Sequence, residues 1–451
     1  MKDVKMPTLP FVLMCATLPL LLQQKPMKKD IELTPSLAAR IAVEIKSNFE
    51  THIRDPWFPR SVDLTSGGGF HQEYSENWTP LQPGRGEKSI VYQSRLTYLA
   101  AQIAGGKTVK SSEFAGYASH GIDFLQNVLW DKQEGGFYWA VDAEGKPETD
   151  RKTEKHAYGI SFGIYAAAEV ARVTKDEKAL TLAKKGFLWL DKHAHDHKNG
   201  GYYEALRRDG TPLLSPPSPT VTGDPIGTHY GYKSMNTHIH LLEAFTSLYA
   251  VWHDESVRKR LEEVFLLVRD KIAVEPGCLN LFFTPDWRAI PDHDSFGHDV
   301  ETAFLLEEAA IALGKPHEVR TEKVSRSLVD HALAYGWDEV NGGFYDAGTA
   351  FGKPVDTAKV WWTQAEGLNA LLQMHLRYKN QTQVYGTAFV RQWAFIRDKQ
   401  TDAVNRGWIT RLTATGEPDG ANQNKSDAWK EPYHQGRAAL HVLENLHLLQ
   451  K

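Results

Sequence analysis

Cysteine is almost missing from the sequence: Cys15 and Cys278 are the only two in 451 residues. They make neither a disulfide framework nor a CxxC pair, so they do not indicate the redox compartment in which the protein works. Charge of one sign is also missing, because the formal net charge is only −4. A nearly balanced charge gives no basis for binding nucleic acid or an anionic membrane. HExxH spacing does not occur either, which removes one signature of a catalytic zinc site.

Long hydrophobic runs are missing apart from one near the start of the chain. The run at 9–22 follows a basic N-terminus and is too short to span a membrane comfortably. We therefore expect residues 1–26 to be an export signal of a periplasmic or secreted protein, or a disordered extension. Two prolines in the run and the lack of an A-x-A site leave a cytoplasmic protein open, with Met6 or Met27 as the true start. We expect residues 27–451 to form one catalytic domain without membrane contact.

Aromatic side chains, in contrast, are plentiful. The chain has 13 Trp and 17 Tyr in a composition that is 41% hydrophobic and 24% charged, which is typical of a globular protein. Most of these rings are expected to fill the core. Those that line a cleft would suit sugars, because the apolar C–H face of a sugar ring stacks on an aromatic ring.

A Gly-Gly dipeptide followed by an aromatic residue recurs along the chain. GGF begins at 68, 135 and 342 and GGY begins at 200, so the steps are 67, 65 and 142 residues, the last being about two units. GCLNLFF at 277–283 stands where the missing copy belongs, and RGW at 406–408 is a degenerate sixth copy. Six units of similar length are typical of a closed or stacked repeat architecture.

Each unit is predicted to contain two helices, one on either side of the Gly-Gly loop. Apolar residues at helical spacing predict the first helices near 34–54, 112–131, 178–193, 255–273, 319–335 and 384–400. The second helices are predicted near 89–104, 155–174, 233–253, 298–313, 359–378 and 430–449, and they are richer in small and apolar residues. This composition favours an all-α (α/α)6 barrel, with the second helices as the inner ring and short β-hairpin loops at one rim. An open solenoid is the alternative, but no polar capping repeat supports it.

Polar side chains gather at the starts of the predicted inner helices. In MNTHIHLLEAF, 235–245, Asn236, His240 and Glu243 share one helix face, whereas His238 points away from His240. The other five starts carry polar and aromatic residues at the same phase of the repeat: Tyr92 and Arg95, His156 and Tyr158, His298 and Glu301, Trp362 and Glu366, and Trp429, His434 and Arg437. If the inner helices run the same way, these side chains converge on one central pocket. The alternative is that each residue only caps or braces its own helix.

Histidines beside carboxylates are compatible with more than one chemistry. Imidazole carries protons near neutral pH, and a carboxylate three or four residues away orients it. His240, His298 and Glu301 could instead form a two-His, one-carboxylate metal site, although no spacing motif supports it. A glycosidase needs two acids flanking the bond, but each glutamate here has a basic or aromatic neighbour at helical spacing.

Four blocks at these positions resemble the N-acylglucosamine 2-epimerase superfamily, and within it most closely the cellobiose 2-epimerases. They are KSMNTHIHLLEAFTSLY, SFGHDVETAFLL, VWWTQAEGLNAL and WKEPYHQGRAAL, spread over most of 34–451. The resemblance implies an (α/α)6 barrel and a cofactor-independent isomerase. The implied reaction inverts C2 of the reducing-end aldose of a β-1,4-linked disaccharide, glucose to mannose, through ring opening and an enediolate.

The resemblance also assigns roles to residues. His298 and His434 are expected to be the two acid/base groups, with His240 assisting ring opening. Arg95 would stabilise the enediolate oxygen, since its guanidinium offers paired donors to developing charge. The other expected substrate contacts are Tyr158, Asn236, Glu243, Glu301, Trp362, Glu366 and Trp429. Glu301 and Glu366 are expected to orient His298 and other polar groups, and no metal is expected.

Inversion needs proton exchange on two faces of one carbon, so two bases on different helices fit the chemistry. Mutual repulsion is expected to leave one imidazole protonated and the other neutral. The sixth block reads PYHQGR where PYHNSR is usual, so we expect Gly436 to loosen the approach to Arg437. The Pro-rich segment 213–233 is expected to reshape the entrance to the pocket.

Other functions remain open at this point. The same scaffold supports an aldose–ketose (mannose) isomerase or an N-acylglucosamine 2-epimerase, and more distantly a barrel glycosidase or a sugar-binding protein. In every case the expected partner is a small-molecule sugar, disaccharide or monosaccharide. The protein is expected to be a monomer or weak dimer.

Overall fold

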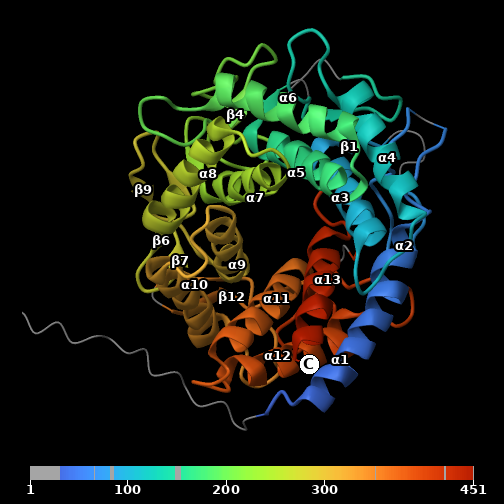
Figure 1. The fold of residues 1–451 in the computed structure, drawn as a ribbon, viewed down its shortest axis with the longest axis vertical. Helices are drawn as coiled ribbons and strands as arrows, with labels where there is room; N and C mark the ends of the chain where they lie inside the picture. The colour runs from blue at the N-terminus through green and yellow to red at the C-terminus, as the bar shows by residue number, and fades with distance from the viewer. Residues whose placement is uncertain are drawn as a thin grey trace, which may run out of the picture.

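Two concentric rings of helices make up the computed structural model, which describes residues 31–65, 67–81, 86–147, 154–350, 352–420 and 423–449. The inner ring consists of α3 (Ile90–Gly105), α5 (Ala157–Thr174), α7 (Met235–Val251), α9 (Phe296–Ala312), α11 (Trp361–Tyr378) and α13 (Tyr433–Leu448). Each inner helix contacts the next, and α13 contacts α3, so the ring is closed (Figure 1). The predicted (α/α)6 barrel is therefore confirmed, and the open solenoid is excluded.

The outer ring consists of α1 (Pro35–Asn48), α4 (Phe114–Phe124), α6 (Glu177–Ala194), α8 (Glu255–Leu267), α10 (Val319–His331) and α12 (Val384–Phe395). Five of these helices continue as a π-helical turn: η1 (Phe49–Arg54), η2 (Leu125–Leu129), η4 (Val268–Ile272), η5 (Ala332–Gly336) and η6 (Ile396–Gln400). A three-residue helix, α2 (Asp55–Trp57), follows η1. The predicted ranges of the outer helices therefore cover both the α-helical part and the π turn.

An outer helix and the inner helix on which it mainly packs belong to different sequence units. Each of the outer helices α4, α6, α8, α10 and α12 packs mainly against the inner helix that precedes it, not the one that follows its Gly-Gly loop. The first helix, α1, packs against the last, α13, at the blue and red ends of the ribbon in Figure 1. The short link between an inner helix and the next outer helix makes this antiparallel pairing the easier one. The barrel is thus closed by the two ends of the described chain.

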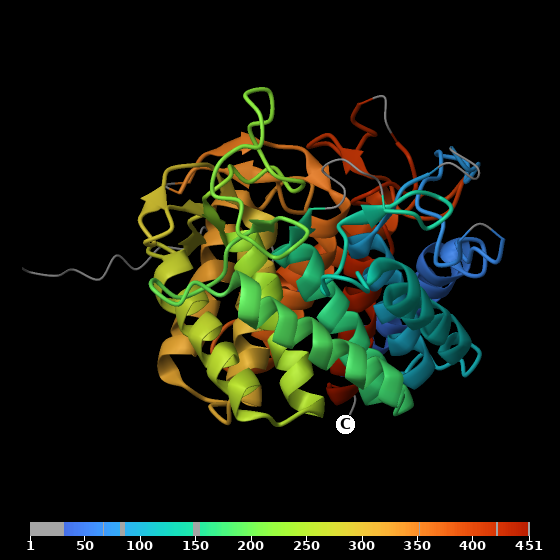
Figure 2. The ribbon, with the colours of Figure 1, turned by 90° about the horizontal axis from the view of Figure 1, so that it is seen from above.

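Short β-strands lie at one end of the barrel, above the helices in Figure 2. They are β1 (Lys88–Ser89), β2 (Ala140–Val141), β3 (Lys155–His156), β4 (Ala205–Leu206), β5 (Lys233–Ser234), β6 (Ala273–Val274), β7 (Cys278–Leu279), β8 (Phe282–Phe283), β9 (Ala289–Ile290), β10 (Asp294–Ser295), β11 (Ala347–Gly348), β12 (Pro354–Asp356), β13 (Lys359–Val360) and β14 (Arg411–Leu412). A strand that precedes an inner helix pairs antiparallel with a strand of the next unit, as β1 with β2 and β13 with β14. Pairing between units therefore ties the rim together.

The Gly-Gly-aromatic loops form hairpins at this rim, as the sequence predicts. The aromatic residue of each loop bridges back to the end of the outer helix, for example Trp130 with Phe137 and Thr401 with Trp408. Gly136 has a φ of +72°, and a Cβ there would lie 2.8 Å from the Trp189 ring, so only glycine fits the turn. The degenerate sixth copy keeps the same backbone, with Arg406 at a φ of +62°.

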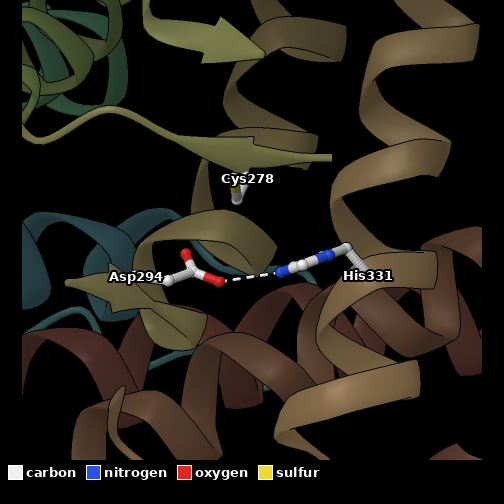
Figure 3. Close-up of side chains that lie close together, drawn as sticks. All are labelled: Cys278, Asp294 and His331. Carbon is white, nitrogen blue, oxygen red and sulfur yellow. Dashed lines mark hydrogen bonds and ion pairs between the residues drawn. The ribbon is translucent and has the colours of Figure 1, made fainter. Parts of the chain in front are cut away.

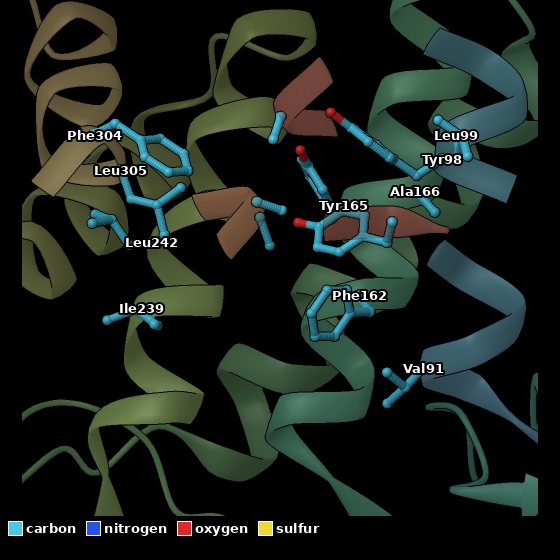
Figure 4. Close-up of a cluster of buried hydrophobic side chains, with 14 of the residues drawn as sticks. Val91, Tyr98, Leu99, Phe162, Tyr165, Ala166, Ile239, Leu242, Phe304 and Leu305 are labelled. Carbon is cyan, nitrogen blue, oxygen red and sulfur yellow. The ribbon is translucent and has the colours of Figure 1, made fainter. Parts of the chain in front are cut away.

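The inner helices are buried on nearly every side, because they face both the outer ring and one another. Figure 4 shows apolar side chains of α3, α5, α7 and α9 packed together, including the stacked rings of Tyr98 and Tyr165, whose centroids are 4.6 Å apart. Gly436 belongs to this packing: a Cβ there would lie 2.7 Å from Cδ1 of Leu99. Gly436 thus allows α13 to approach α3 closely. We expected it to loosen the surroundings of Arg437, and it does not.

The predicted export segment, 1–26, lies outside the described residues and remains a prediction. Within the described part of the chain, every helix is too short or too polar to span a bilayer.

Candidate active site

A cavity of about 220 Å³ opens among the N-terminal ends of the inner helices, on the side of the β-hairpins. All six inner helices, or the segments just before them, contribute to its wall. The lining residues are Arg95, Tyr158, Ile226, Asn236, His240, His298, Glu301, Trp361, Trp362, Trp429 and His434. A parallel inner ring therefore brings the polar helix starts together, as the repeat predicts.

Side-chain caps start three of these helices and so fix where the polar residues fall. Ser89 Oγ accepts the backbone N–H of Tyr92, and Ser234 Oγ accepts that of Thr237. His156 caps α5 in the same way, through Nδ1. Each cap satisfies an amide that the helix cannot pair. The three caps occupy equivalent positions, directly before an inner helix. The side chains of the first turn therefore lie at equivalent positions along the barrel axis in each of these helices.

His434 is buried, and two carboxylates lie on the Nδ1 side of its ring. Its Nδ1 lies 2.6 Å from Oε1 of Glu366, and Oε1 of Glu301 lies 3.9 Å away. A carboxylate accepts a hydrogen bond and cannot donate one when ionised, so Glu366 selects the tautomer with a proton on Nδ1. The lone pair on Nε2 is then the part of His434 that is available to a substrate.

His298 faces the same cavity but has a different partner. Its Nδ1 lies 2.7 Å from the hydroxyl oxygen of Ser295, which can donate or accept, so either tautomer is compatible with this contact. The ring centroids of His298 and His434 lie 4.7 and 5.6 Å from that of Trp362. The two imidazoles therefore flank one tryptophan at the cavity wall. Glu301, expected to orient His298, instead accepts from Arg437.

Four charged residues at the back of the cavity form a buried cluster, here called the Arg437 cluster: Glu301, which lines the cavity, and Glu243, Glu366 and Arg437 behind it. The guanidinium donates to all three carboxylates, at 2.5 Å to Glu301 and 2.8 Å to Glu366. Burial alone would raise the pKa of Glu243, but Arg437 and His240 together hold it at about 2. The Glu243 carboxylate is therefore ionised and lies 3.1 Å from Nδ1 of His240.

Arg95 is fixed at the opposite side of the site. It donates to Glu431 at 2.6 Å and to the Tyr158 hydroxyl at 3.2 Å, and its guanidinium lies 4.4 Å from the Phe162 ring centroid. The ion pair and the ring contact prevent the guanidinium from moving with solvent. Arg95 is thus a preorganised cation, the type of group that stabilises an oxyanion.

Both candidate acid/base histidines are neutral in this site at pH 7. Burial, with a smaller contribution from the nearby imidazoles of His240 and His434, lowers the pKa of His298 to about 4, although Glu301 acts to raise it. Burial and the charge of Arg95 hold the pKa of His434 well below its usual value. We expected one imidazole to be protonated and the other neutral. The difference arises because desolvation acts on both rings alike.

The structure places nine of the eleven predicted site residues on the cavity wall. The other two, Glu243 and Glu366, lie behind it in the Arg437 cluster and contact His240 and His434 instead of the cavity. His238, which the spacing sets apart, is a core residue: its Nε2 accepts the backbone N–H of Tyr202. His238 therefore anchors the hairpin of the third unit to the inner ring.

Several residues at the site received no role from the sequence. Ser295, Glu431, Tyr433 and Arg437 hold the catalytic candidates, whereas Ile226 and Trp361 line the cavity. Tyr433 and Arg437 are four residues apart on one helix face, which was the available signal for them. Ile226 comes from the Pro-rich segment, which thus forms part of the entrance, and no helical pattern could have indicated it.

The alternative metal site of His240, His298 and Glu301 is not the grouping that the structure forms. Among the described residues, the metal-type ligand atoms that gather here belong to Glu301, Glu366 and His434. Arg437 already donates to both of these glutamates. A guanidinium at that place competes with a metal cation for the same oxygens, so this group does not suit a metal.

Comparison with known proteins agrees with this geometry. The sequence profile of the N-acylglucosamine 2-epimerase (GlcNAc 2-epimerase) family matches residues 68–438. The chain is 30% identical over 408 residues to the cellobiose 2-epimerase of Bacteroides fragilis, which covers 89% of this chain and 98% of that protein. It is also 26% identical over 351 residues to the D-mannose isomerase of Pseudomonas cannabina pv. alisalensis, over 72% of this chain and 77% of that protein.

A solved structure with the same architecture is the cellobiose 2-epimerase from Spirochaeta thermophila DSM 6192. It superposes with a TM-score of 0.81 at 29% identity, covering 92% of this chain and 99% of that chain. The profile spans most of the chain and includes the N-terminal ends of all six inner helices, from which the cavity is built. The protein therefore belongs to the N-acylglucosamine 2-epimerase family.

Proposed function

We propose that this protein is a sugar 2-epimerase that inverts C2 of the reducing-end aldose of a β-1,4-linked disaccharide, converting glucose to mannose. The observation that carries the proposal is the pair His298 and His434. Both line one cavity, both contact Trp362, and each is held through Nδ1 by a different group. Two independently held imidazoles can exchange protons with two faces of one carbon.

The reaction begins with opening of the hemiacetal ring, which exposes the C1 carbonyl. His240, held by ionised Glu243, is placed to assist this proton transfer. One imidazole then removes the C2 proton, the C–H electron pair forms a C1–C2 double bond, and the carbonyl electrons move to O1. Arg95 is the fixed cation that stabilises the resulting enediolate oxygen.

Reprotonation completes the inversion from the other side of the enediolate. It needs one proton on the second imidazole, and because both rings are neutral beforehand, this ring takes up a proton from solvent as the enediolate forms. The negative enediolate favours this uptake by raising the pKa of the ring beside it. After turnover the two rings have exchanged roles, so the same site catalyses the reverse direction without a reset step.

The size of the cavity favours a substrate that extends out of it. About 220 Å³ is below the usual range of 300–1,000 Å³ for ligand pockets, which suits one sugar ring rather than two. Trp429 lies on the wall with 42% of its surface exposed, so a second ring can stack on it at the entrance. The similarity to cellobiose 2-epimerases supports this choice of disaccharide.

Incubation with cellobiose in D2O, followed by NMR, tests the proposal. The expected result is a disaccharide of unchanged chain length whose reducing end is partly mannose and carries deuterium at C2. Lactose and mannose serve as comparison substrates. Release of monosaccharide would indicate a glycosidase, and binding without exchange would indicate a sugar-binding protein.

A second candidate is the aldose–ketose isomerase, because the D-mannose isomerase of Pseudomonas cannabina pv. alisalensis is a relative over most of the chain. Both reactions share the enediolate and differ in where the proton returns: to C2 in an epimerase and to C1 in an isomerase. A ketose as the main product, with mannose as the better substrate, would favour the isomerase.

A further inference from the structure

Five of the six repeat units share a buried ion pair that supports the hairpin at the rim. A lysine before the inner helix donates to an aspartate at the start of the hairpin: Lys88 to Asp63, Lys155 to Asp131, Lys233 to Asp196, Lys359 to Asp338, and Lys425 to Asp402. In four of them the ammonium also donates to the carbonyl of a glycine in the same loop. The pair is thus a general support of the rim.

The fourth unit has different chemistry at the same positions. Asp294 replaces the lysine at the start of β10, and Val274 replaces the hairpin aspartate. Cys278 stands in place of the second glycine of the loop. His331, the last residue of α10, stands where α4, α8 and α12 end in Phe124, Leu267 and Phe395.

A fourth change lies on the inner helix. Gln93 and Gln364 bind the backbone of the hairpin aromatic residue, and His238 does so in the third unit. At the same phase, five residues after the lysine position, the fourth unit has Asp299. One unit has therefore gained a thiol, an imidazole and two carboxylates where the other units have none of this combination.

These side chains meet in the structure. One ligand atom each from Cys278, Asp294 and His331 lie within 4.8 Å of one another, and all three residues are at most 2% exposed. Figure 3 shows Asp294 and His331 pointing toward each other beneath Cys278, with 2.8 Å between Oδ2 and Nε2. The Asp299 carboxyl lies beside that of Asp294, so it adjoins the group without being one of the three mutually close ligands.

Several buried polar atoms of this group lack hydrogen-bond partners among the described residues. Neither carboxylate oxygen of Asp299 has a hydrogen-bond partner of good geometry, although the Leu279 amide and the Asp294 carboxyl lie close to it, and Oδ1 of Asp294 and Nδ1 of His331 have none either. Asp299 is fully buried, and in the described part of the chain no lysine or arginine forms an ion pair with either aspartate. Buried charge without a partner is costly, so such oxygens are usually neutralised by a proton or bound to a cation.

We propose that Cys278, Asp294 and His331 bind one zinc-type divalent metal ion. Thiolate, imidazole and carboxylate are donors that zinc prefers, and the buried Asp299 carboxyl beside Asp294 supports these ligands from outside the group. Binding releases the proton shared by Asp294 and His331 and the thiol proton to solvent, and the metal bonds replace both. None of the four residues lines the active-site cavity, so the metal is structural.

The site also adjoins the catalytic machinery. Asp294 is followed in β10 by Ser295, whose hydroxyl contacts Nδ1 of His298. A metal that holds Asp294 therefore fixes the strand that orients His298. The metal replaces the lysine–aspartate support of the other units and does so beside a catalytic candidate.

Metal binding to the whole chain tests the proposal. Protein freed of metal with a chelator is titrated with Zn²⁺, desalted and measured by mass spectrometry, and in parallel with Co²⁺ by absorption spectroscopy. We expect one ion per chain, a raised melting temperature, and a thiolate-to-cobalt charge-transfer band. Cys278→Ser should remove the band, and Asp299→Asn should weaken zinc binding at least tenfold.

His331→Phe is the matched variant, because Phe124 and Phe395 occupy this position in other units and the variant should fold. It should bind no zinc yet keep the melting temperature of the metal-free parent. His293→Gln, at an exposed histidine next to Asp294, is the control and should bind normally. The proposal is overturned if the folded parent retains no metal, or if His331→Phe retains as much as the parent.

Discussion

The two candidate acid/base residues of this site are both histidines, and they differ in the group that contacts Nδ1. His298 rests on a hydroxyl and His434 on a carboxylate, so the two rings are not equivalent even though both are neutral. The carboxylate fixes a basic Nε2 on His434, whereas the hydroxyl lets His298 present either a lone pair or an N–H. This asymmetry lets one ring receive a proton while the other supplies one.

Replacing each histidine separately should show which face it serves. His298→Asn and His434→Asn should each lower epimerisation by roughly 10²- to 10⁴-fold, the usual contribution of a general acid or base. The remaining imidazole can still remove and return a proton on its own face. Each variant should therefore label one epimer at C2 in D2O without inverting it, and the two variants should label different epimers.

The double variant is the control and should label neither epimer. If both single variants label the same epimer, the two rings act on one face, and the two-base mechanism is wrong. NMR of purified cellobiose and of its mannose-containing epimer gives the readout in each case.

Arg437 is the residue on which the buried carboxylates depend. Removing one partner of a buried ion pair costs about 3–5 kcal/mol, because the other charge is left uncompensated. Arg437→Met should therefore lower the free energy of unfolding by about that amount, measured with urea, and lower activity because Glu366 would no longer be held against His434. Arg258→Met is the matched control: Arg258 forms an ion pair with exposed Glu255, so its loss should leave the free energy of unfolding nearly unchanged and activity unchanged. A stable and active Arg437→Met would contradict the assigned role.

At the scale of elements, the inner helices supply most of the cavity wall, and the Pro-rich loop adds Ile226 to it. Asp224 holds that loop: its Oδ2 lies 2.8 Å from Nε2 of His156, and its Oδ1 accepts the backbone N–H of Ile226 at 3.0 Å. The carboxylate raises the pKa of His156 against the effect of burial. A charged pair thus carries Ile226 to the cavity wall.

Asp224→Asn should loosen this loop and weaken substrate binding. The amide keeps the shape but loses the charge, so we expect KM for cellobiose to rise by roughly tenfold, about 1.4 kcal/mol, with kcat nearly unchanged. Asp209→Asn is the matched control, since Asp209 accepts a similar turn hydrogen bond at 2.9 Å on an exposed loop. An equal effect of both variants would show that the His156 contact does not matter.

At the scale of the whole molecule, buried neutral histidines should make stability depend on pH. Burial lowers the pKa of His238 to about 3 and that of His441 to about 4, as it does for His298. Between about pH 4 and 6.5 the unfolded chain binds protons that the folded chain does not, so stability falls as pH falls, by about 1.4 kcal/mol per unit and group. Glu204, whose pKa is raised by burial to about 7, acts in the opposite direction.

Urea unfolding at pH 7 and pH 5.5 measures this dependence. The midpoint should be lower at pH 5.5, and His238→Gln should show a smaller difference between the two pH values than the parent. Equal differences in the parent and in His238→Gln would mean that His238 does not contribute to the pH dependence and that its assigned protonation state is wrong.

Much of the barrel follows from the sequence alone because its information is local and repeated. The Gly-Gly-aromatic period and the helical spacing predict twelve main helices, their order and the convergence of polar helix starts, since these depend on neighbours along the chain. The motif blocks predict the family for the same reason. The sequence does not predict which outer helix packs on which inner helix, because this depends on packing across short links and on the contact of α1 with α13.

Only the tertiary structure decided the contacts between residues far apart in the chain. Arg437 meets Glu243 from a helix that is 194 residues away, and no spacing rule predicts a contact at that separation. Burial, which makes both candidate acid/base imidazoles neutral, is likewise a property of the closed ring rather than of any segment. The same holds for Cys278, Asp294, Asp299 and His331, which lie on different elements and come together only when the fourth unit folds. A sequence determines which side chains share a helix face, and the closed barrel determines which faces meet.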